Sequence, residues 1–188
     1  MRGQTVATRT FWWDRTSDAD VDPLRAVIFD LDAVIDTDDA GDPAAPDGLL
    51  DLVMSLFVAG VWVAVVSTGR RTDVEPLVRE LFGDGLVETI VTADDVTGFD
   101  PSTEVYELAM WELGAGPESC LAMVGSGAAL RITSSVGLAA VVVASEYSAF
   151  DDFTTAVSER SSYDALMAAD CQRLHRLWYA KQKRFAAA

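Results

Sequence analysis

Two aspartates stand two positions apart where an apolar run of the chain ends. Asp30 and Asp32 occur in the stretch AVIFDLDAV. A carboxylate can attack a phosphoryl group and form an aspartyl phosphate, while a neighbouring carboxylate moves the proton of the leaving group. Carboxylate oxygens are also the ligands that Mg²⁺ prefers, so Asp30 and Asp32 predict a weakly held Mg²⁺. Asp-x-Asp alone is not specific, because it also occurs in loops and helix caps.

Hydroxyl groups follow the next apolar run. Ser67, Thr68 and Gly69 end the stretch VAVVSTG. Hydroxyls and backbone N–H groups at the junction of a strand and a helix can hold phosphate oxygens. We therefore predict that these three residues bind phosphate. Taken by itself, Ser67 is better explained as an ordinary helix N-cap.

Alternating short apolar runs and helical segments position these residues. Strands are expected at 26–31, 61–66, 86–92, 120–124 and 138–144, with an edge strand near 155–159. Helices are expected at 48–59, 73–82, 100–113 and 128–136. Strands that are apolar on both faces and alternate with helices predict an α/β fold with a parallel sheet of about five strands. In such sheets, ligands bind at the carboxyl ends of the strands, where Asp30 and Ser67 fall.

Four segments in this order resemble the haloacid dehalogenase (HAD) superfamily, particularly its β-phosphoglucomutase-like and phosphoglycolate-phosphatase-like branch. They are AVIFDLDAVID, VAVVSTG, VTADDVTGFDPSTEVYELAMWELG and LAMVGSGAALRITSSVGLAAVVV, between about residues 25 and 166. The resemblance implies a Rossmann-like core and a Mg²⁺-dependent phosphatase. It also implies that Asp30 is the nucleophile, Asp32 the acid/base and Ser67 the phosphate-binding hydroxyl.

The chain departs from the pattern of that family at charged positions. The family segment Gly-Lys-Pro-x-Pro reads Gly98-Phe99-Asp100-Pro101 here, so Phe99 occupies or borders the lysine position. Lys181 and Lys183 are the only lysines of the chain. The acidic metal motif after the fourth strand reads Val124-Gly125-Ser126, without a carboxylate. Asp151 and Asp152 lie beyond the fifth strand and match that motif poorly. Ala33 stands where the family usually has glycine, which is a mild change.

The segment between Asp30 and Ser67 is too short for the cap domain of the resembled branch. We expect residues 36–48 to form a small loop and to leave the site open. Asp36, Asp38, Gly41 and Asp47 also fall at positions 1, 3, 6 and 12 of a calcium-binding loop. Alanines at positions 5 and 9, and a strand in place of the first helix, favour a solvated acidic turn.

Composition excludes several classes of function. The 188 residues carry a net charge of −16, which opposes binding to nucleic acid or to anionic membranes. Residues 52–69 are uncharged, but Gly60 divides them into a helix and a strand, so no membrane span is expected. The two cysteines, Cys120 and Cys171, form no Cys-x-x-Cys pair and suit a reducing cytoplasm.

The two ends of the chain differ from its centre. We divide the sequence into a leader (1–24), an HAD-like α/β domain (25–170) and a basic C-terminal helix or tail (171–188). The leader contains Phe11-Trp12-Trp13, which either packs on the core or anchors an interface. Apolar residues spaced by three and four from Tyr163 to Trp178 predict an amphipathic helix, with His175 at the surface. Its basic end is explained by the helix dipole or by docking to a partner.

Three functions follow from this reading. The first is an HAD-like hydrolase with incomplete phosphoaspartate machinery, weakly active or inactive, that acts by binding a phosphorylated small molecule or a protein partner. The second is an active Mg²⁺-dependent phosphohydrolase that uses Asp30 and Asp32, with Arg131 or Arg70 in place of the lysine. The third is a structural or regulatory subunit. The sequence does not specify the substrate or the oligomeric state.

Overall fold

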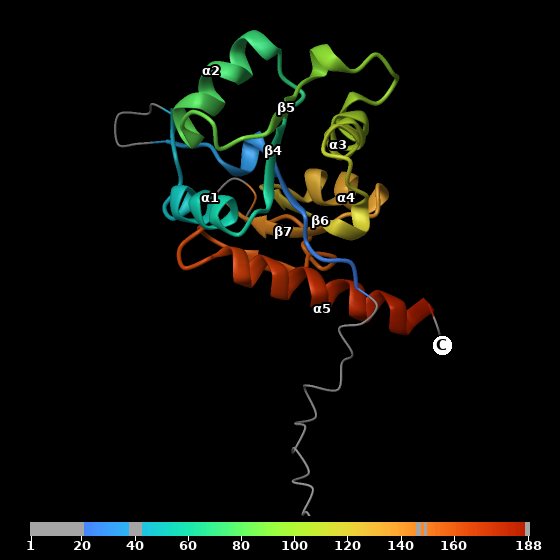
Figure 1. Ribbon diagram of the computed structural model, residues 1–188. Helices are drawn as coiled ribbons and strands as arrows, with labels where there is room; N and C mark the ends of the chain where they lie inside the picture. The colour runs from blue at the N-terminus through green and yellow to red at the C-terminus, as the bar shows by residue number, and fades with distance from the viewer. Residues whose placement is uncertain (1–20, 38–42, 146–147, 149, 187–188) are drawn as a thin grey trace, which may run out of the picture.

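The computed structural model describes residues 21–37, 43–145, 148 and 150–186. Its centre is a parallel sheet of six strands in the order β5-β4-β1-β6-β7-β8 (Figure 1). The strands are β1 (Ala26–Asp30), β4 (Trp62–Val66), β5 (Thr89–Val91), β6 (Cys120–Val124), β7 (Ala139–Val143) and β8 (Ser158–Arg160). The predicted α/β fold is confirmed, and β8 occupies the edge expected near 155–159.

Helices cover both faces of the sheet. Successive side chains of a strand point to opposite faces, and both sets are apolar here, so each face needs a covering layer. Val27 and Phe29 of β1 face a core shared with α1 (Leu49–Val58), α2 (Arg71–Phe82) and α5 (Ala168–Ala186). Ala26 and Ile28 face the opposite core, which α3 (Pro101–Glu112) and α4 (Gly127–Ser135) cover. In Figure 1, α1 and α2 lie to the left of α3 and α4, and α5 runs along the bottom of the molecule.

Short elements connect these layers. The 3₁₀ turns are η3 (Leu31–Ala33), η4 (Ala93–Asp95) and η5 (Pro117–Ser119). After η3, the two-residue strands β2 (Asp36–Thr37) and β3 (Pro43–Ala44) pair antiparallel. Asp38 and Gly41 of the calcium-loop hypothesis, and Phe11-Trp12-Trp13 of the leader, lie outside the described residues. Within the described ranges, no helix is both long and apolar enough to cross a membrane.

The C-terminal segment corrects two predictions. Helix α5 begins at Ala168, because Ala165 adopts a positive φ of 56° and turns the chain between Tyr163 and the helix. His175 is fully buried rather than exposed. Its Nε2 lies 2.9 Å from the Glu118 carbonyl oxygen, and its ring packs against Tyr179 with centroids 4.8 Å apart. The apolar spacing identified the buried stripe of the helix, but it could not show that a histidine would share this stripe.

Candidate active site

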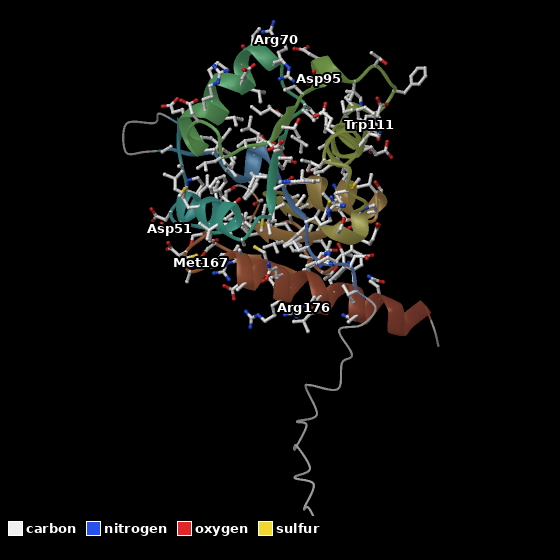
Figure 2. The ribbon with its side chains drawn as sticks, in the orientation of Figure 1. Asp51, Arg70, Asp95, Trp111, Met167 and Arg176 are labelled. Atoms are coloured by element: carbon white, nitrogen blue, oxygen red, sulfur yellow. The ribbon has the colours of Figure 1, made fainter. Side chains whose placement is uncertain are left out.

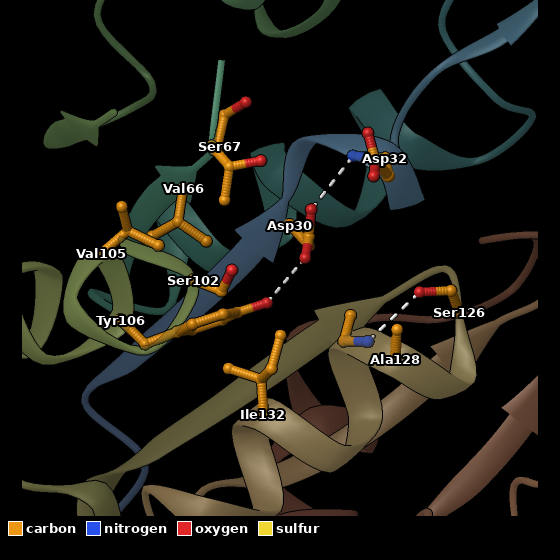
Figure 3. Close-up of a pocket in the computed structure, with 12 residues that line it drawn as sticks. Asp30, Asp32, Val66, Ser67, Ser102, Val105, Tyr106, Ser126, Ala128 and Ile132 are labelled. Carbon is orange, nitrogen blue, oxygen red and sulfur yellow. Dashed lines mark hydrogen bonds between the residues drawn. The ribbon is translucent and has the colours of Figure 1, made fainter. Parts of the chain in front are cut away.

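Three strand ends meet at one hollow of about 140 Å³ (Figure 3). Asp30 ends β1 at the centre of the sheet, Ser67 follows β4, and Ser126 follows β6. All three line the hollow, together with Asp32 and Thr68. The structure thus brings together the residues that the sequence placed at the carboxyl ends of these strands, with the exception of Gly69, which does not line it.

Asp30 is anchored through both carboxylate oxygens. Its Oδ2 accepts a hydrogen bond of 2.7 Å from the Tyr106 hydroxyl, and its Oδ1 accepts one of 3.2 Å from the Asp32 backbone N–H. Burial raises the pKa of Asp30 above its usual value, and the nearby Asp32 charge adds to this rise. The two hydrogen bonds act against the rise, because they stabilise the carboxylate form.

Tyr106 and Ser102 are site residues that the sequence analysis missed. They lie on one face of α3 with Val105 and line the hollow. Tyr106 is only 2% exposed. Burial, followed by the charge of Asp30, raises the pKa of Tyr106 well above its usual value, so its hydroxyl remains a neutral donor. A helix that begins at Pro101 places residues 102, 105 and 106 on one face. This helical spacing was the sequence signal that could have identified Ser102 and Tyr106.

Asp32 lies in η3, just beyond the end of β1. The turn directs its backbone N–H to Asp30 while its own side chain is exposed at the rim of the hollow. Asp32 is therefore more accessible to solvent than the half-buried Asp30. This contrast suits the nucleophile and acid/base roles that the family resemblance implies for Asp30 and Asp32.

The loop after β4 is organised by its own hydroxyl. Ser67 Oγ accepts a hydrogen bond of 3.1 Å from the Gly69 N–H, and Ser67 N–H donates to the Val91 carbonyl oxygen. Ser67 does not cap α2, whose N-cap residue is Arg70. The hydroxyls of Ser67 and Thr68 at this edge of the hollow are available as donors to a phosphate oxygen.

The first turn of α4 forms the opposite wall. Ser126 caps this helix, and its Oγ accepts a hydrogen bond of 3.2 Å from the Ala129 N–H. Asp151 lies beside the same turn, where its Oδ2 accepts a hydrogen bond of 2.7 Å from the Gly127 N–H. Asp151 is nevertheless not among the residues that line the hollow. A carboxylate therefore occupies part of the positive end of the helix that would otherwise face an anion.

Gly125 is packed against the turn that carries Asp32. A methyl group at this position would lie 3.0 Å from the Asp32 carbonyl oxygen and 3.1 Å from Ala33 Cα. Both neighbours are backbone atoms, which cannot rotate away as a side chain can. The close approach of β6 and η3 therefore leaves little room for an acidic side chain at position 125.

None of the described residues that line the hollow is basic. Phe99 is fully exposed to solvent. Arg70, at the edge of the molecule (Figure 2), lies 3.5 Å from Asp73, and Arg131 is exposed. Arg71 donates to Asp95 at 2.7 Å and to the Ile90 carbonyl oxygen, which ties α2 to β5 and η4. No arginine considered as a substitute for the lysine thus takes part in the hollow.

The donor set fits a loosely held Mg²⁺. Mg²⁺ is commonly held by one or two carboxylates together with phosphate oxygens and water, and Asp30 and Asp32 supply two carboxylates here. Over the described ranges, no three His, Cys, Asp or Glu side chains gather closely enough to hold a metal ion. Asp30 and Asp32 are thus the residues that would hold it, with tight binding dependent on a ligand phosphate.

Comparison with known proteins finds curated relatives that match part of the chain. No family model matches it. It is 34% identical over 113 residues, 58% of the chain, to protein CbbY of Rhodobacter capsulatus, and 32% identical over 119 residues, 62% of the chain, to protein CbbY of Cereibacter sphaeroides. The chain spans about half the length of these curated relatives, 49% and 52% respectively.

Solved structures show the same fold. The chain matches CbbY from Rhodobacter sphaeroides in complex with phosphate with a TM-score of 0.67 and 19% identity, over 79% of this chain and 99% of that one. It matches β-phosphoglucomutase from Clostridium difficile with a TM-score of 0.68 and 13% identity, over 83% of this chain and 99% of that one. The chain therefore shares its overall fold with these proteins.

Proposed function

We propose that the chain is a member of the haloacid dehalogenase superfamily, which its similarity to CbbY supports, and that it binds a phosphorylated ligand at the Asp30 hollow and hydrolyses it slowly or not at all. The observation that carries this proposal is the charge of the hollow. Two carboxylates line it, and no basic side chain among the described residues does. The hollow thus keeps an attacking group and phosphate-binding hydroxyls without the positive charge that phosphoryl transfer requires.

The ligand class follows from the groups at the rim. Ser67 and Thr68 present hydroxyl donors on one side, and Ser126, the N-cap residue of α4, lines the other side. One CbbY structure is a complex with phosphate, and another is a complex with xylulose-(1,5)-bisphosphate. These complexes support a phosphate ester as the ligand of the present hollow. The short segment 36–48 leaves the identity of the rest of the ligand open, including a phosphorylated protein.

Electrostatics sets the expected rate. A phosphate dianion at the hollow lies beside Asp30 and Asp32, and like charges 4 Å apart repel by about 4 kcal/mol at an effective dielectric of 20. Bound Mg²⁺ would supply positive charge at this point. In a turnover, Asp30 would attack the phosphorus atom and form an aspartyl phosphate as the bond to the leaving oxygen breaks, and Asp32 would give that oxygen a proton. Water would then hydrolyse the aspartyl phosphate, with Asp32 accepting a proton from the water, and phosphate would be released. The loss of one preorganised electrostatic contact typically costs ~10²–10³ in rate.

An active phosphohydrolase is the second candidate function. The position of Asp30 and Asp32 at the end of β1 favours it, because both candidate catalytic carboxylates line the hollow. The distribution of charge is against it, since Arg70 and Arg131 do not line the hollow. A purely structural or regulatory role remains the third expectation.

A paired assay distinguishes these functions. Release of phosphate from p-nitrophenyl phosphate with Mg²⁺ is measured for the wild type and for Asp30→Asn, while calorimetry measures binding of inorganic phosphate with Mg²⁺. We expect binding, and turnover at least ~10³-fold below about 10 s⁻¹, a common enzyme rate. Turnover near that common rate that Asp30→Asn abolishes would establish the active phosphohydrolase instead. Failure of both binding and turnover would leave the structural role.

A further inference from the structure

A second hollow lies at the opposite edge of the sheet. It has a volume of about 240 Å³ and is lined by Phe57 at the end of α1, by Trp62 at the start of β4, and by Leu86 and Glu88 before β5. Because Trp62 begins its strand while Asp30 ends β1, this hollow faces the amino ends of the strands. We refer to it as the basal groove.

Exposed aromatic side chains line the basal groove. Phe57 is 59% exposed and Trp62 is 40% exposed. On the same helix α1, Leu50, Met54 and Val58 follow one another at helical spacing and are also exposed. Exposed apolar side chains that gather in this way are typical of a contact site. A partner with aromatic side chains would fill it best.

We propose that Phe11-Trp12-Trp13 of the leader packs into the basal groove of the same chain. The chain enters the fold next to this groove, because the Arg25 guanidinium lies over the Trp62 ring at 5.1 Å from its centroid. Trp13 precedes Arg25 by twelve positions. An extended segment of that length spans up to about 40 Å, so the tether brings the aromatic residues to the groove at high effective concentration.

Charge favours the leader over a second copy of the chain. Residues 1–21 contain three arginines and three aspartates, so this segment is neutral while the whole chain carries −16. Two copies of so acidic a protein repel each other, whereas the neutral leader does not face this barrier. Arg9 and Arg15 flank the aromatic residues, and Glu88 lines the groove, which gives the leader a complementary charge at the rim.

Hydrogen exchange measured by mass spectrometry on the full chain tests this contact. We expect amides of residues 10–14, and those of residues 57–63 and 85–88, to exchange about tenfold or more slowly than in the double variant Trp12→Ser/Trp13→Ser. Phe57→Ser, which changes only an exposed side chain of the groove, should release the leader to the same extent. Trp111→Ser is the matched control, because Trp111 is an exposed tryptophan on α3, across the sheet (Figure 2).

Three results would overturn the proposal. Leader amides that exchange at the rate of a free chain show that the aromatic residues do not dock. Protection of the leader that Phe57→Ser leaves unchanged shows that they dock elsewhere. Protection that disappears on tenfold dilution shows that the groove binds a second copy. Since the basal groove and the Asp30 hollow are at opposite ends of the strands, these results are independent of phosphate binding.

Discussion

At the residue scale, the side-chain partner of Asp30 is the neutral hydroxyl of Tyr106. It donates at 2.7 Å to Asp30 Oδ2 from a side chain that is almost completely buried. A neutral donor stabilises the carboxylate without offsetting the charge of an incoming phosphate. Tyr106 therefore keeps Asp30 ionised and oriented, but it does not replace a lysine in phosphoryl transfer.

Replacement of Tyr106 by Phe should raise the pKa of Asp30 further. The ring is kept, but the hydrogen bond that lowers this pKa is lost, and about 1–3 kcal/mol of stability is lost with it. Carbon-13 NMR titration of the Asp30 carboxyl measures the change. Tyr163→Phe is the control, because the buried Tyr163 hydroxyl donates to the Ala33 carbonyl oxygen at 2.8 Å instead. An unchanged Asp30 titration in Tyr106→Phe would contradict the role of Tyr106.

The sign of the effect on folding follows from the same pKa. The pKa of Asp30 is raised above 3.8 in the folded chain, so the folded form binds this proton more tightly than the unfolded form does. The associated stability is present at low pH and is lost as the pH rises from 3.8 through the folded value. Tyr106→Phe should extend this loss to higher pH, which urea denaturation at a series of pH values would detect.

A single added carboxylate should strengthen Mg²⁺ binding if it is placed at Ser126. Ser126→Asp adds a third carboxylate to the wall of the hollow and keeps the cap of α4, since aspartate is also a good N-cap residue. We expect about a tenfold rise in Mg²⁺ affinity by calorimetry. Gly125→Asp is the matched variant, and it should lose about 1–3 kcal/mol of stability because its side chain meets the backbone of Asp32 and Ala33. Equal behaviour of the two variants would contradict this geometry.

At the element scale, α1 depends on a glycine at its start. Gly48 has a φ of +80°, and a methyl group there would lie 2.5–2.7 Å from backbone atoms of Tyr163 and Asp164. Gly60, just after α1, has a φ of +70°, but a methyl group added there would have no atom within 4 Å. Gly60→Ala should cost about 1 kcal/mol from backbone strain, and Gly48→Ala distinctly more, because it also displaces the Tyr163 segment. Thermal unfolding of both variants measures the difference.

Helix α5 is held by a buried histidine whose charge depends on pH. Burial lowers the pKa of His175 below 6.5, although the hydrogen bond to Glu118 partly opposes this. As the pH falls, His175 is protonated in the unfolded chain before it is protonated in the folded chain. The stability that comes from neutral His175 is therefore present above pH 6.5 and is lost as the pH falls below this value. His175→Gln should weaken this dependence between about pH 7.5 and 5.5, as followed by urea denaturation. An identical pH dependence in both proteins would exclude His175 as its source.

Regular elements could be predicted from the sequence where apolar spacing, caps and glycines agreed. Helix α3 begins at Pro101 as expected, because a proline at the first position of a helix loses no hydrogen bond. The strand expected at 86–92 is shorter, since β5 covers only Thr89–Val91 at the sheet edge. The start of α5 was missed because it depends on a turn at Ala165, whose positive φ is unusual for alanine.

At the scale of the whole molecule, the site could be predicted only in part. The strand ends identify Asp30 and Ser67, because parallel topology brings carboxyl ends to one edge. The Tyr106 partner, the Asp151 contact and the tight approach at Gly125 join residues that are far apart in the chain. Such contacts depend on the packing of α3 and α4 on the finished sheet, which local spacing does not encode.

The net charge of −16 should give phosphate binding an unusual dependence on salt. At a basic site, added salt screens attraction and weakens the binding of anions. Here a phosphate dianion approaches an acidic protein and two carboxylates, so added salt screens repulsion. With EDTA in place of Mg²⁺, an increase in KCl from about 0.05 to 0.5 M should tighten phosphate binding by about two- to fivefold in calorimetry. Binding that weakens with salt in the absence of Mg²⁺ would reveal a basic side chain at the hollow and would favour an active phosphohydrolase.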